Sequence, residues 1–382
     1  MPPPAPQRLG RDFLRVTIGN FFFFLTFASF FLLPLHIRAL GGSERMVGFL
    51  IGTTGISGLA GVLVVGQLLD RYGCIFFLRA GTIVMGVATL GFLLPSEIGL
   101  ALFALRIVQG LAFSCAFNAA ATLAVELAPP ARRTTALGLF GISTLLTHAI
   151  APTLGEQLIA RGGFPLLFLV AAGFCVVALS VTWTLPAPPV RPRNATATPL
   201  RAIRGFAPAV ASIGCCGVAF GTTLTFMPTF VREEGLGLVS AFYVAYTITA
   251  VGVRVVGGGL ADRIGHRPVL LPAMLVLAIA VASIASVHSV PALVGSGFVF
   301  GLAQGFIYPT MNAYAVGLVD PSQLGRAQSS YNGAFNLGTT MGSFVFGNVV
   351  HAYGHRVMFV ACAAVVLVAM GIFAVGDVGE RG

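Results

Sequence analysis

Charge is what this sequence has least of: only 9% of its 382 residues are charged, and lysine is absent altogether. Soluble globular domains carry about 25% charged residues, so this composition excludes a water-soluble protein. Hydrophobic residues make up 57% of the chain. Apolar stretches of about 20 residues recur along its length, each long enough to cross roughly 30 Å of hydrocarbon. The sequence therefore predicts an all-α membrane protein.

The sequence also lacks the patterned groups of an enzyme or a metal site. Its six cysteines show no metal-ligand spacing, and we interpret them as small buried hydrophobes. There is no G-x-S-x-G and no G-x-x-x-x-G-K. We expect no catalytic residue, no metal, no cofactor and no enzymatic activity. The net charge of +10 would suit a nucleic-acid-binding protein, but the arginines lie singly between apolar spans, so no nucleic-acid partner is expected.

Twelve membrane-spanning helices are predicted, arranged as two six-helix bundles at residues 1–185 and 207–382. Between them, residues 186–206 are rich in proline and arginine and have no apolar helical period, which indicates a cytoplasmic linker. The predicted spans lie near residues 14–38, 46–69, 75–95, 98–127, 135–159, 164–185, 207–231, 239–261, 268–287, 290–319, 327–352 and 356–376.

The arginines predict the orientation, because cytoplasmic loops of membrane proteins are enriched in basic residues. With the N-terminus inside, sixteen arginines fall on the cytoplasmic side and five on the outer side. The basic start followed by an apolar stretch resembles a signal peptide, but the stretch is long enough to span, so we interpret it as an uncleaved first helix. We expect a multi-pass inner-membrane protein with both termini in the cytoplasm.

The two halves of the sequence repeat each other. Residues 34–38 (PLHIR) match 228–232 (PTFVR), residues 66–73 (GQLLDRYG) match 258–265 (GGLADRIG), and Gln109-Gly110 match Gln304-Gly305. The offsets between the matches are 194, 192 and 195 residues. Parallel repeats of this kind predict two similar bundles with a substrate cavity at their interface.

Over its full length the chain resembles the major facilitator superfamily. The most specific element is that family's loop signature G-x-x-x-D-R-x-G-R-R, which begins at residue 66 in the first half and at residue 258 in the second. The second copy fits better, because in the first copy Cys74 and Ile75 replace the trailing basic pair. The resemblance implies a secondary transporter that alternates between two states. It implies a gating role for Gly66, Asp70, Arg71, Gly73, Gly258, Asp262, Arg263, Gly265 and Arg267.

The residue types of this motif also suggest why it would gate. An aspartate at a helix end can pair with neighbouring arginines or with a helix N-terminus, and glycine permits a sharp reversal of the chain. Such a contact, formed in one state and broken in the other, biases a two-state equilibrium. The alternative is that Asp70 and Asp262 only hold tight turns.

Three ionisable residues in the spans are candidates for proton coupling: Arg106, His148 and Glu156. A charge within a span is costly, so Arg106 is expected to face a cavity or a partner. His148, Pro152 and Glu156 follow at four-residue steps on one helix face. The resemblance associates the Arg106–Gly110 pattern with proton coupling, and the partial match of residues 151–156 (APTLGE) to the antiporter motif implies a helix kink at Pro152. The alternatives are a structural anchor for Arg106, an interhelical donor for His148 and a pair with Arg161 for Glu156.

Uncharged polar and aromatic side chains are expected to line the substrate cavity, or else to hold helices together. The predicted substrate-binding residues are Asn20, Gln109, Phe113, Asn118, Gln304, Tyr308, Asn312, Tyr331, Asn332 and Asn336. The run Phe21–Phe24 covers all sides of its helix and is interpreted as lipid-facing packing.

The leading hypothesis is proton-coupled efflux of a small amphipathic or drug-like molecule by a monomer in the lipid bilayer. Two alternatives share the fold: a proton-coupled symporter for uptake of a metabolite, and a lipid flippase. The partial antiporter motif favours export over uptake.

Overall fold

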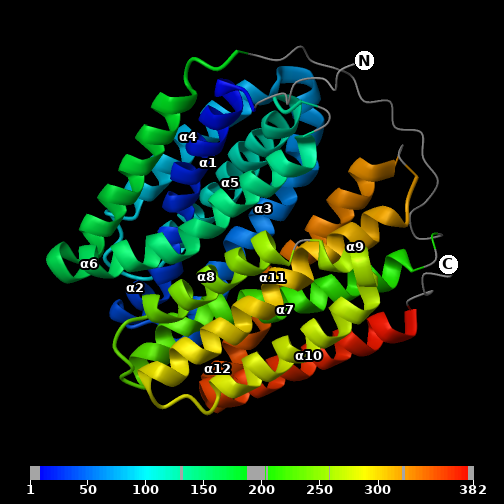
Figure 1. Cartoon of the computed structure of the whole chain (residues 1–382). Helices are drawn as coiled ribbons and strands as arrows, with labels where there is room; N and C mark the ends of the chain where they lie inside the picture. The colour runs from blue at the N-terminus through cyan, green and yellow to red at the C-terminus, as the bar shows by residue number, and fades with distance from the viewer. Residues whose placement is uncertain are drawn as a thin grey trace, which may run out of the picture. The chain divides into compact units, whose positions relative to one another are not determined.

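The fold is known from a computed structural model that describes residues 9–129, 132–186, 203, 205–257, 259–320 and 323–376. Throughout these residues the regular structure is helical, and no strand occurs among them (Figure 1). In this part of the chain, nine helices are long and apolar enough to cross a membrane. The prediction of an all-α membrane protein is therefore confirmed.

The helices of the first half follow the predicted spans to within a few residues. They are α1 (Arg11–Ser29), η1 (Phe30–Leu32), α2 (Leu33–Ala39), α3 (Glu44–Tyr72), α4 (Cys74–Gly91), α5 (Leu100–Glu126) and α6 (Arg133–Thr182).

The second half repeats this order of elements. Its helices are α7 (Phe206–Glu233), α8 (Ser240–Val256), α9 (Leu260–Ile264), α10 (His266–Ile284), α11 (Val290–Gly317) and α12 (Leu324–Gly376).

Two of these helices are each two spans joined without a loop. The backbone of α6 leaves helical geometry at Gly162 and Gly163, and that of α12 does so at Gly354. Both breaks fall between predicted spans, five from six and eleven from twelve. With α8 as a shorter apolar helix of 17 residues, the described helices are consistent with the twelve predicted spans.

Left-handed glycines mark the same places in both halves. Gly73 (φ 80°, ψ 153°) and Gly265 (φ 90°, ψ 159°) each immediately precede a helix, 192 residues apart and with nearly identical backbone angles. Residues with a Cβ rarely adopt such a φ, so the glycine that ends each motif copy is required by the turn. The positive-φ pairs 41/235 and 163/354 lie 194 and 191 residues apart. The backbone therefore repeats with nearly the period of the sequence.

The chain forms two compact units whose border does not follow the repeat. The first unit comprises Met1–Phe30 and Ile56–Asn194, and the second comprises Phe31–Gly55 and Ala195–Gly382. The segment from η1 to the first part of α3 belongs by sequence to the first half, yet it packs in the second unit. The predicted division at residues 1–185, 186–206 and 207–382 stays a prediction, and residues 187–202 and 204 of the linker lie outside the described part.

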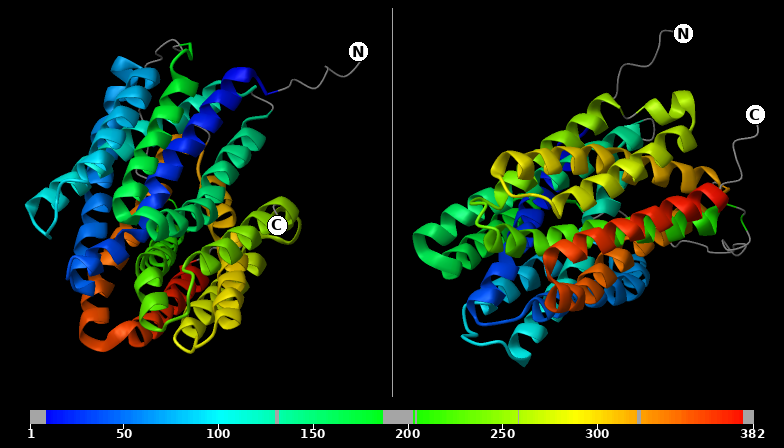
Figure 2. Two further views of the ribbon diagram at one scale, coloured as in Figure 1. Left: turned by 90° about the vertical axis from the view of Figure 1, so that its left-hand side faces the viewer. Right: turned by 90° about the horizontal axis from the view of Figure 1, so that it is seen from below.

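Each unit is held together by helices distant in sequence. In the first unit, α1 packs along α6 and α4 packs along α5. In the second unit, α7 packs along α12, whose last part, red in Figure 2, runs beside the green α7. Helix α11 packs on α8 and on α10. Buried cysteines at 175, 216 and 362 serve as small apolar side chains, and the described residues contain no group of His, Cys, Asp and Glu suited to a metal ion.

Candidate functional site

Arg106 is buried in the first unit, as its position in the sequence predicted. Its side chain is 4% exposed, and Nη1 donates a hydrogen bond to Oε1 of Gln109, 2.8 Å away. The guanidinium carbon lies 5.6 Å from the centre of the Phe30 ring, a cation–π distance. Gln109 in turn donates to the hydroxyl of Thr89 on α4, at 3.4 Å. An amide and an aromatic face therefore both contact the arginine.

An aromatic cluster lies on α1 and α5 of the same unit. The ring of Phe113 is 4.4 Å from that of Phe27, 5.6 Å from that of Phe24 and 5.2 Å from that of Phe117. Phe23 and Phe24 are buried, at 2% and 7% exposure. The lipid-facing interpretation is wrong for these two residues, because the apolar surface of α5 covers that side of α1. Phe113 stands among the aromatic rings, as a substrate-binding residue would.

The other polar residues of the first unit have separate partners. Asn20 is buried, its Nδ2 donates to the Thr144 hydroxyl at 3.0 Å, and its Oδ1 has no hydrogen-bond partner. Asn118 donates to the Ser114 carbonyl of its own helix at 2.7 Å. His148 is buried, with its ring 6.0 Å from that of Phe24.

Glu156 and Pro152 both lie in α6, where the glutamate is half-buried. The backbone is helical at Pro152 and departs from helix only at the two glycines ten residues later. The proton path through Arg106, His148 and Glu156 and the kink at Pro152 stay predictions.

In the second unit, predicted residues of α11 and α12 form one hydrogen-bonded group. The Tyr308 hydroxyl donates to Oδ1 of Asn332 at 2.9 Å, and the buried Tyr331 hydroxyl donates to the Tyr308 carbonyl at 2.5 Å. Gln328 also donates to Asn332, at 3.4 Å. The guanidinium carbon of Arg254 on α8 lies 6.0 Å from the centre of the Tyr308 ring. This group contains a cation, two phenols and an amide, and can therefore bind a polar part of a ligand.

The remaining predicted residues of this unit differ in exposure. Gln304 is buried, and its Nε2 has no hydrogen-bond partner. Asn312 is half-buried and Asn336 is exposed.

The motif residues stand at helix ends, as predicted. Arg71 is exposed beside the Tyr72 ring, 5.4 Å from its centre. Asp262 and Arg263 are exposed in the short α9, and Arg267 donates to the Ala374 carbonyl at 3.3 Å. Gly66 and Asp70 belong to α3, but the side chain of Asp70 lies outside the described part, as does Gly258. The gating role stays a prediction.

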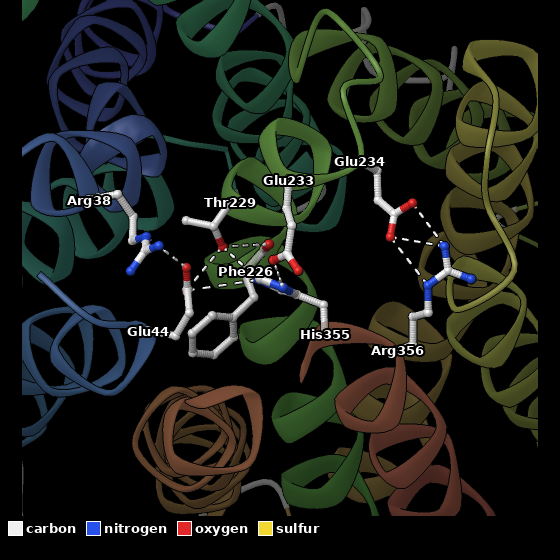
Figure 3. Close-up of polar contacts among 8 residues, drawn as sticks. All are labelled: Arg38, Glu44, Phe226, Thr229, Glu233, Glu234, His355 and Arg356. Atoms are coloured by element: carbon white, nitrogen blue, oxygen red, sulfur yellow. Dashed lines mark hydrogen bonds and ion pairs between the residues drawn. The ribbon is translucent and has the colours of Figure 1, made fainter. Parts of the chain in front are cut away.

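A second polar group was not predicted. It comprises Arg38 (α2), Glu44 (α3), Thr229 and Glu233 (α7) and His355 (α12), all within the second unit, and is called the outer polar cluster below (Figure 3). The Thr229 hydroxyl lies 3.1 Å from Oε2 of Glu44 and 2.9 Å from Nε2 of His355. Nδ1 of His355 lies 2.7 Å from a carboxylate oxygen of Glu233. Arg38 pairs with Glu44 at 3.4 Å.

Sequence reasoning missed this cluster and Arg254 for different reasons. Glu44 and His355 are 311 residues apart and belong to different helices, α3 and α12, so no local pattern joins them. Glu233 and Glu234 are the one adjacent pair of carboxylates in the sequence, a signal that was available. Arg254 was assigned to the cytoplasmic loops, whereas its side chain is half-buried against Tyr308.

The comparisons with known proteins agree with this architecture. The family model described as Major Facilitator Superfamily matches residues 16–288 and 240–378. The chain belongs to the major facilitator superfamily. The family makes it a transporter of a small-molecule substrate across a lipid bilayer and a multi-pass membrane protein, and it points away from an enzyme.

Two curated relatives of this superfamily member are exporters by name. The staphylopine export protein of Staphylococcus aureus is 21% identical over 379 residues, which cover 94% of each chain. The multi-drug resistance efflux pump PmrA of Streptococcus pneumoniae is 28% identical over 149 residues, 37% of each chain.

Solved superfamily structures share the fold. A bacterial homolog of the human lysosomal transporter Spinster superposes with a TM-score of 0.81 at 14% identity, covering 96% of both chains. The nucleoside transporter NupG superposes with a TM-score of 0.75 at 16% identity, covering 97% of this chain and all of the other.

Proposed function

We propose that this chain is a secondary active transporter that exports a small amphipathic or drug-like molecule across the inner membrane in exchange for protons. Export is supported by the names of two relatives, one an exporter of staphylopine and one a multidrug efflux pump. The partial antiporter motif at residues 151–156 supports the same direction.

The observation that carries proton coupling is the burial of Arg106 within a span. A charged arginine at the centre of a span costs at least about 2.5–3.5 kcal/mol. Gln109 and the Phe30 ring offset part of this cost. A permanently positive centre changes how readily nearby acids and histidines bind protons. Arg106 with His148 and Glu156 is therefore the proposed coupling group.

We propose one set of substrate-binding residues in each unit. In the first unit they are Asn20, Gln109, Phe113 and Asn118. In the second unit they are Gln304, Tyr308, Asn312, Tyr331, Asn332 and Asn336, to which we add Arg254. The two motif copies, from Gly66 and from Gly258 onward, are the proposed inner gates. The protein is proposed to work as a monomer with both termini in the cytoplasm.

A thermal-shift screen of the purified protein at two pH values finds the ligand, because a molecule that binds only the folded state raises Tm. The most strongly stabilising compound is then added to the outside of everted membrane vesicles that carry a pH gradient, and its accumulation inside them is measured. We expect accumulation that stops when the gradient is dissipated and that Arg106→Ala abolishes. Arg133→Ala is the matched control, since Arg133 is exposed at the start of α6 and has no proposed role.

Accumulation that both Arg106→Ala and Glu156→Gln leave unchanged contradicts this mechanism. Gradient-driven movement in the opposite direction identifies the uptake symporter instead. Transfer of a fluorescent lipid between leaflets, independent of the compound found in the screen, identifies the flippase.

A further inference from the structure

The outer polar cluster joins segments from both sequence repeats inside one compact unit. Arg38 and Glu44 flank the turn between the first two spans, whereas Glu233 ends α7 and His355 follows the break in α12. Helix α3 meets α12 there almost without side chains between them. A Cβ added to Gly48 would lie 2.4 Å from the Ser343 carbonyl oxygen. The turn is therefore held against the second-half helices by close packing as well as by charge.

Side-chain exposure is lowest in the middle of the cluster, since Arg38 at one end is 52% exposed. His355 is 3% exposed, Glu44 is 11% exposed and Glu233 is 64% exposed. Nε2 of His355 lies 3.9 Å from the Glu44 carboxylate, with the Thr229 hydroxyl within hydrogen-bond distance of both (Figure 3). The imidazole is therefore almost fully enclosed between two carboxylates, of which one is open to solvent and can pass a proton inward.

The short distances fit a cluster that holds one proton between Glu44 and His355. When Glu44 is ionised, the single hydroxyl proton of Thr229 is directed at Glu44 or at the Phe226 carbonyl. Nε2 of His355 then donates to the Thr229 oxygen. At 2.7 Å from a carboxylate oxygen, an unprotonated Nδ1 would oppose a lone pair to a negative charge, although this contact is not an in-line hydrogen bond. The observed arrangement thus suits an imidazolium.

With Glu44 and Glu233 ionised, the charges around His355 balance when its imidazole is protonated. Arg38 and the imidazolium together offset Glu44 and Glu233. The neighbouring Glu234 does not alter this balance, because Arg356 contacts it through Nε and Nη2 at 2.8–3.2 Å, with His288 also beside Arg356. Arg45 lies over the Phe49 ring instead. Loss of the proton leaves one uncompensated negative charge in a mostly enclosed group, which is unfavourable.

We propose that the outer polar cluster is a proton-binding gate, in which a proton shared by Glu44 and His355 holds the α2–α3 turn against α7 and α12 and its loss releases the turn. Burial lowers the pKa of His355 but raises the pKa of Glu44 to about 6, so the pair takes up the proton in the closed form. By linkage, low outside pH then favours closure. A proton taken from outside would thus close the outer end, which is the step that proton-driven export needs next. This inference rests on the proposed function for its place in the transport cycle.

Both ends of the segment that carries the turn lie where the helices can bend. Span 1 changes unit at η1, a single turn of 3₁₀-helix between α1 and α2. A short 3₁₀ stretch inside a longer helical segment often marks a hinge. Span 2 changes unit between Gly55 and Ile56, within a glycine-rich part of α3. The segment 31–55 can therefore shift as one piece.

Hydrogen–deuterium exchange of the full chain in lipid nanodiscs tests the gate at pH 5.5 and pH 8.0. Exchange of residues 37–49 is normalised to an unstructured reference peptide, which removes the intrinsic effect of pH. We expect at least about tenfold stronger protection at the lower pH in the wild type. The double variant Glu44→Gln, His355→Gln is expected to remove this difference. His351→Gln, at an exposed histidine on the same helix, is expected to keep it.

Glu233→Gln provides a second variant with little risk to folding, since Glu233 is mostly exposed. It removes a charge that favours the imidazolium, so the midpoint of protection should fall by roughly half a pH unit, as for an exposed ion pair. Equal normalised protection at both pH values in the wild type overturns the gate. The same pH response in His351→Gln and in the double variant overturns it too. The vesicle assay of proton-driven efflux tests the proposed function separately. Its outcome depends on Arg106, which does not belong to the outer polar cluster.

Discussion

At the scale of single residues, Asn20 distinguishes a ligand-binding role from a structural one. Its amide donates to Thr144, but its buried Oδ1 has no protein partner, and buried polar atoms are usually satisfied. We expect Asn20→Ala to raise KM for the exported compound several-fold, because a ligand donor loses its acceptor. Thr144→Val removes only the helix–helix bond, at about 1 kcal/mol, and should lower Tm with KM unchanged. Equal effects of the two variants on KM would contradict a ligand role.

Arg254 provides the second prediction at this scale. Its guanidinium lies against the Tyr308 ring, and burial gives such a contact more weight than it has in water. Arg254→Gln should weaken binding of compounds with a carboxylate about tenfold and leave neutral analogues nearly unaffected. A thermal-shift titration with matched acid and amide compounds measures the difference. If both compounds lose the same affinity, Arg254 supports the helices and does not select the ligand.

The sequence predicted the buried arginine but not the outer polar cluster, and the physical reason is distance along the chain. Arg106 is conspicuous because a charge inside an apolar span has a known cost. Glu44 and His355 lie between predicted spans, where charge is ordinary. Their proximity depends on how α3, α7 and α12 pack, and a hydropathy pattern contains no information about packing partners.

At the scale of helices, glycine controls how closely α3 approaches α12. The carbonyl of Ser343 and the backbone of Gly347 leave no room for a Cβ at Gly48. Gly48→Ala should therefore destabilise the second unit by about 1–3 kcal/mol, the usual cost of overpacking, and should increase hydrogen exchange in residues 37–49. Gly173→Ala is the control, because nothing lies within 4 Å of a Cβ at that position; it should raise Tm slightly. Gly48→Ala with unchanged Tm would mean that α3 and α12 are separated in the membrane.

Helix positions were predictable because the hydrocarbon thickness fixes the length of each span, and every predicted span agrees with a described helix to within a few residues. The junctions at Gly163 and Gly354 were also predicted, although the helices there continue without a loop. The change of unit within spans 1 and 2 was not predictable, since both sides of η1 are equally apolar.

At the scale of the whole molecule, the predicted topology assigns each loop to one side of the membrane. Contacts within each unit agree with this assignment. In the second unit, the contacting residues all follow odd-numbered spans: Glu44 follows span 1, Glu234 span 7, His288 span 9 and His355 span 11. Their contacts connect α3, α7, α12 and the loop before α11. In the first unit, Arg15 bonds Thr184 and Arg79 bonds the Trp183 carbonyl, which joins the starts of spans 1 and 3 to the end of span 6. Within each unit, segments that the predicted topology places on one side of the membrane therefore contact one another.

This parity makes a prediction that reporter fusions can test. Alkaline phosphatase is active only outside the cytoplasm, so a fusion after Ser96, between the third and fourth spans, should be active. A fusion after Pro129, one span later, should be inactive, and green fluorescent protein at the C-terminus should fluoresce. The reason is the arginine distribution, sixteen inside against five outside, which sets orientation at insertion. The opposite pattern would place the outer polar cluster on the cytoplasmic side, and a proton bound there would close the inner end instead, which reverses the direction of exchange that the gate favours.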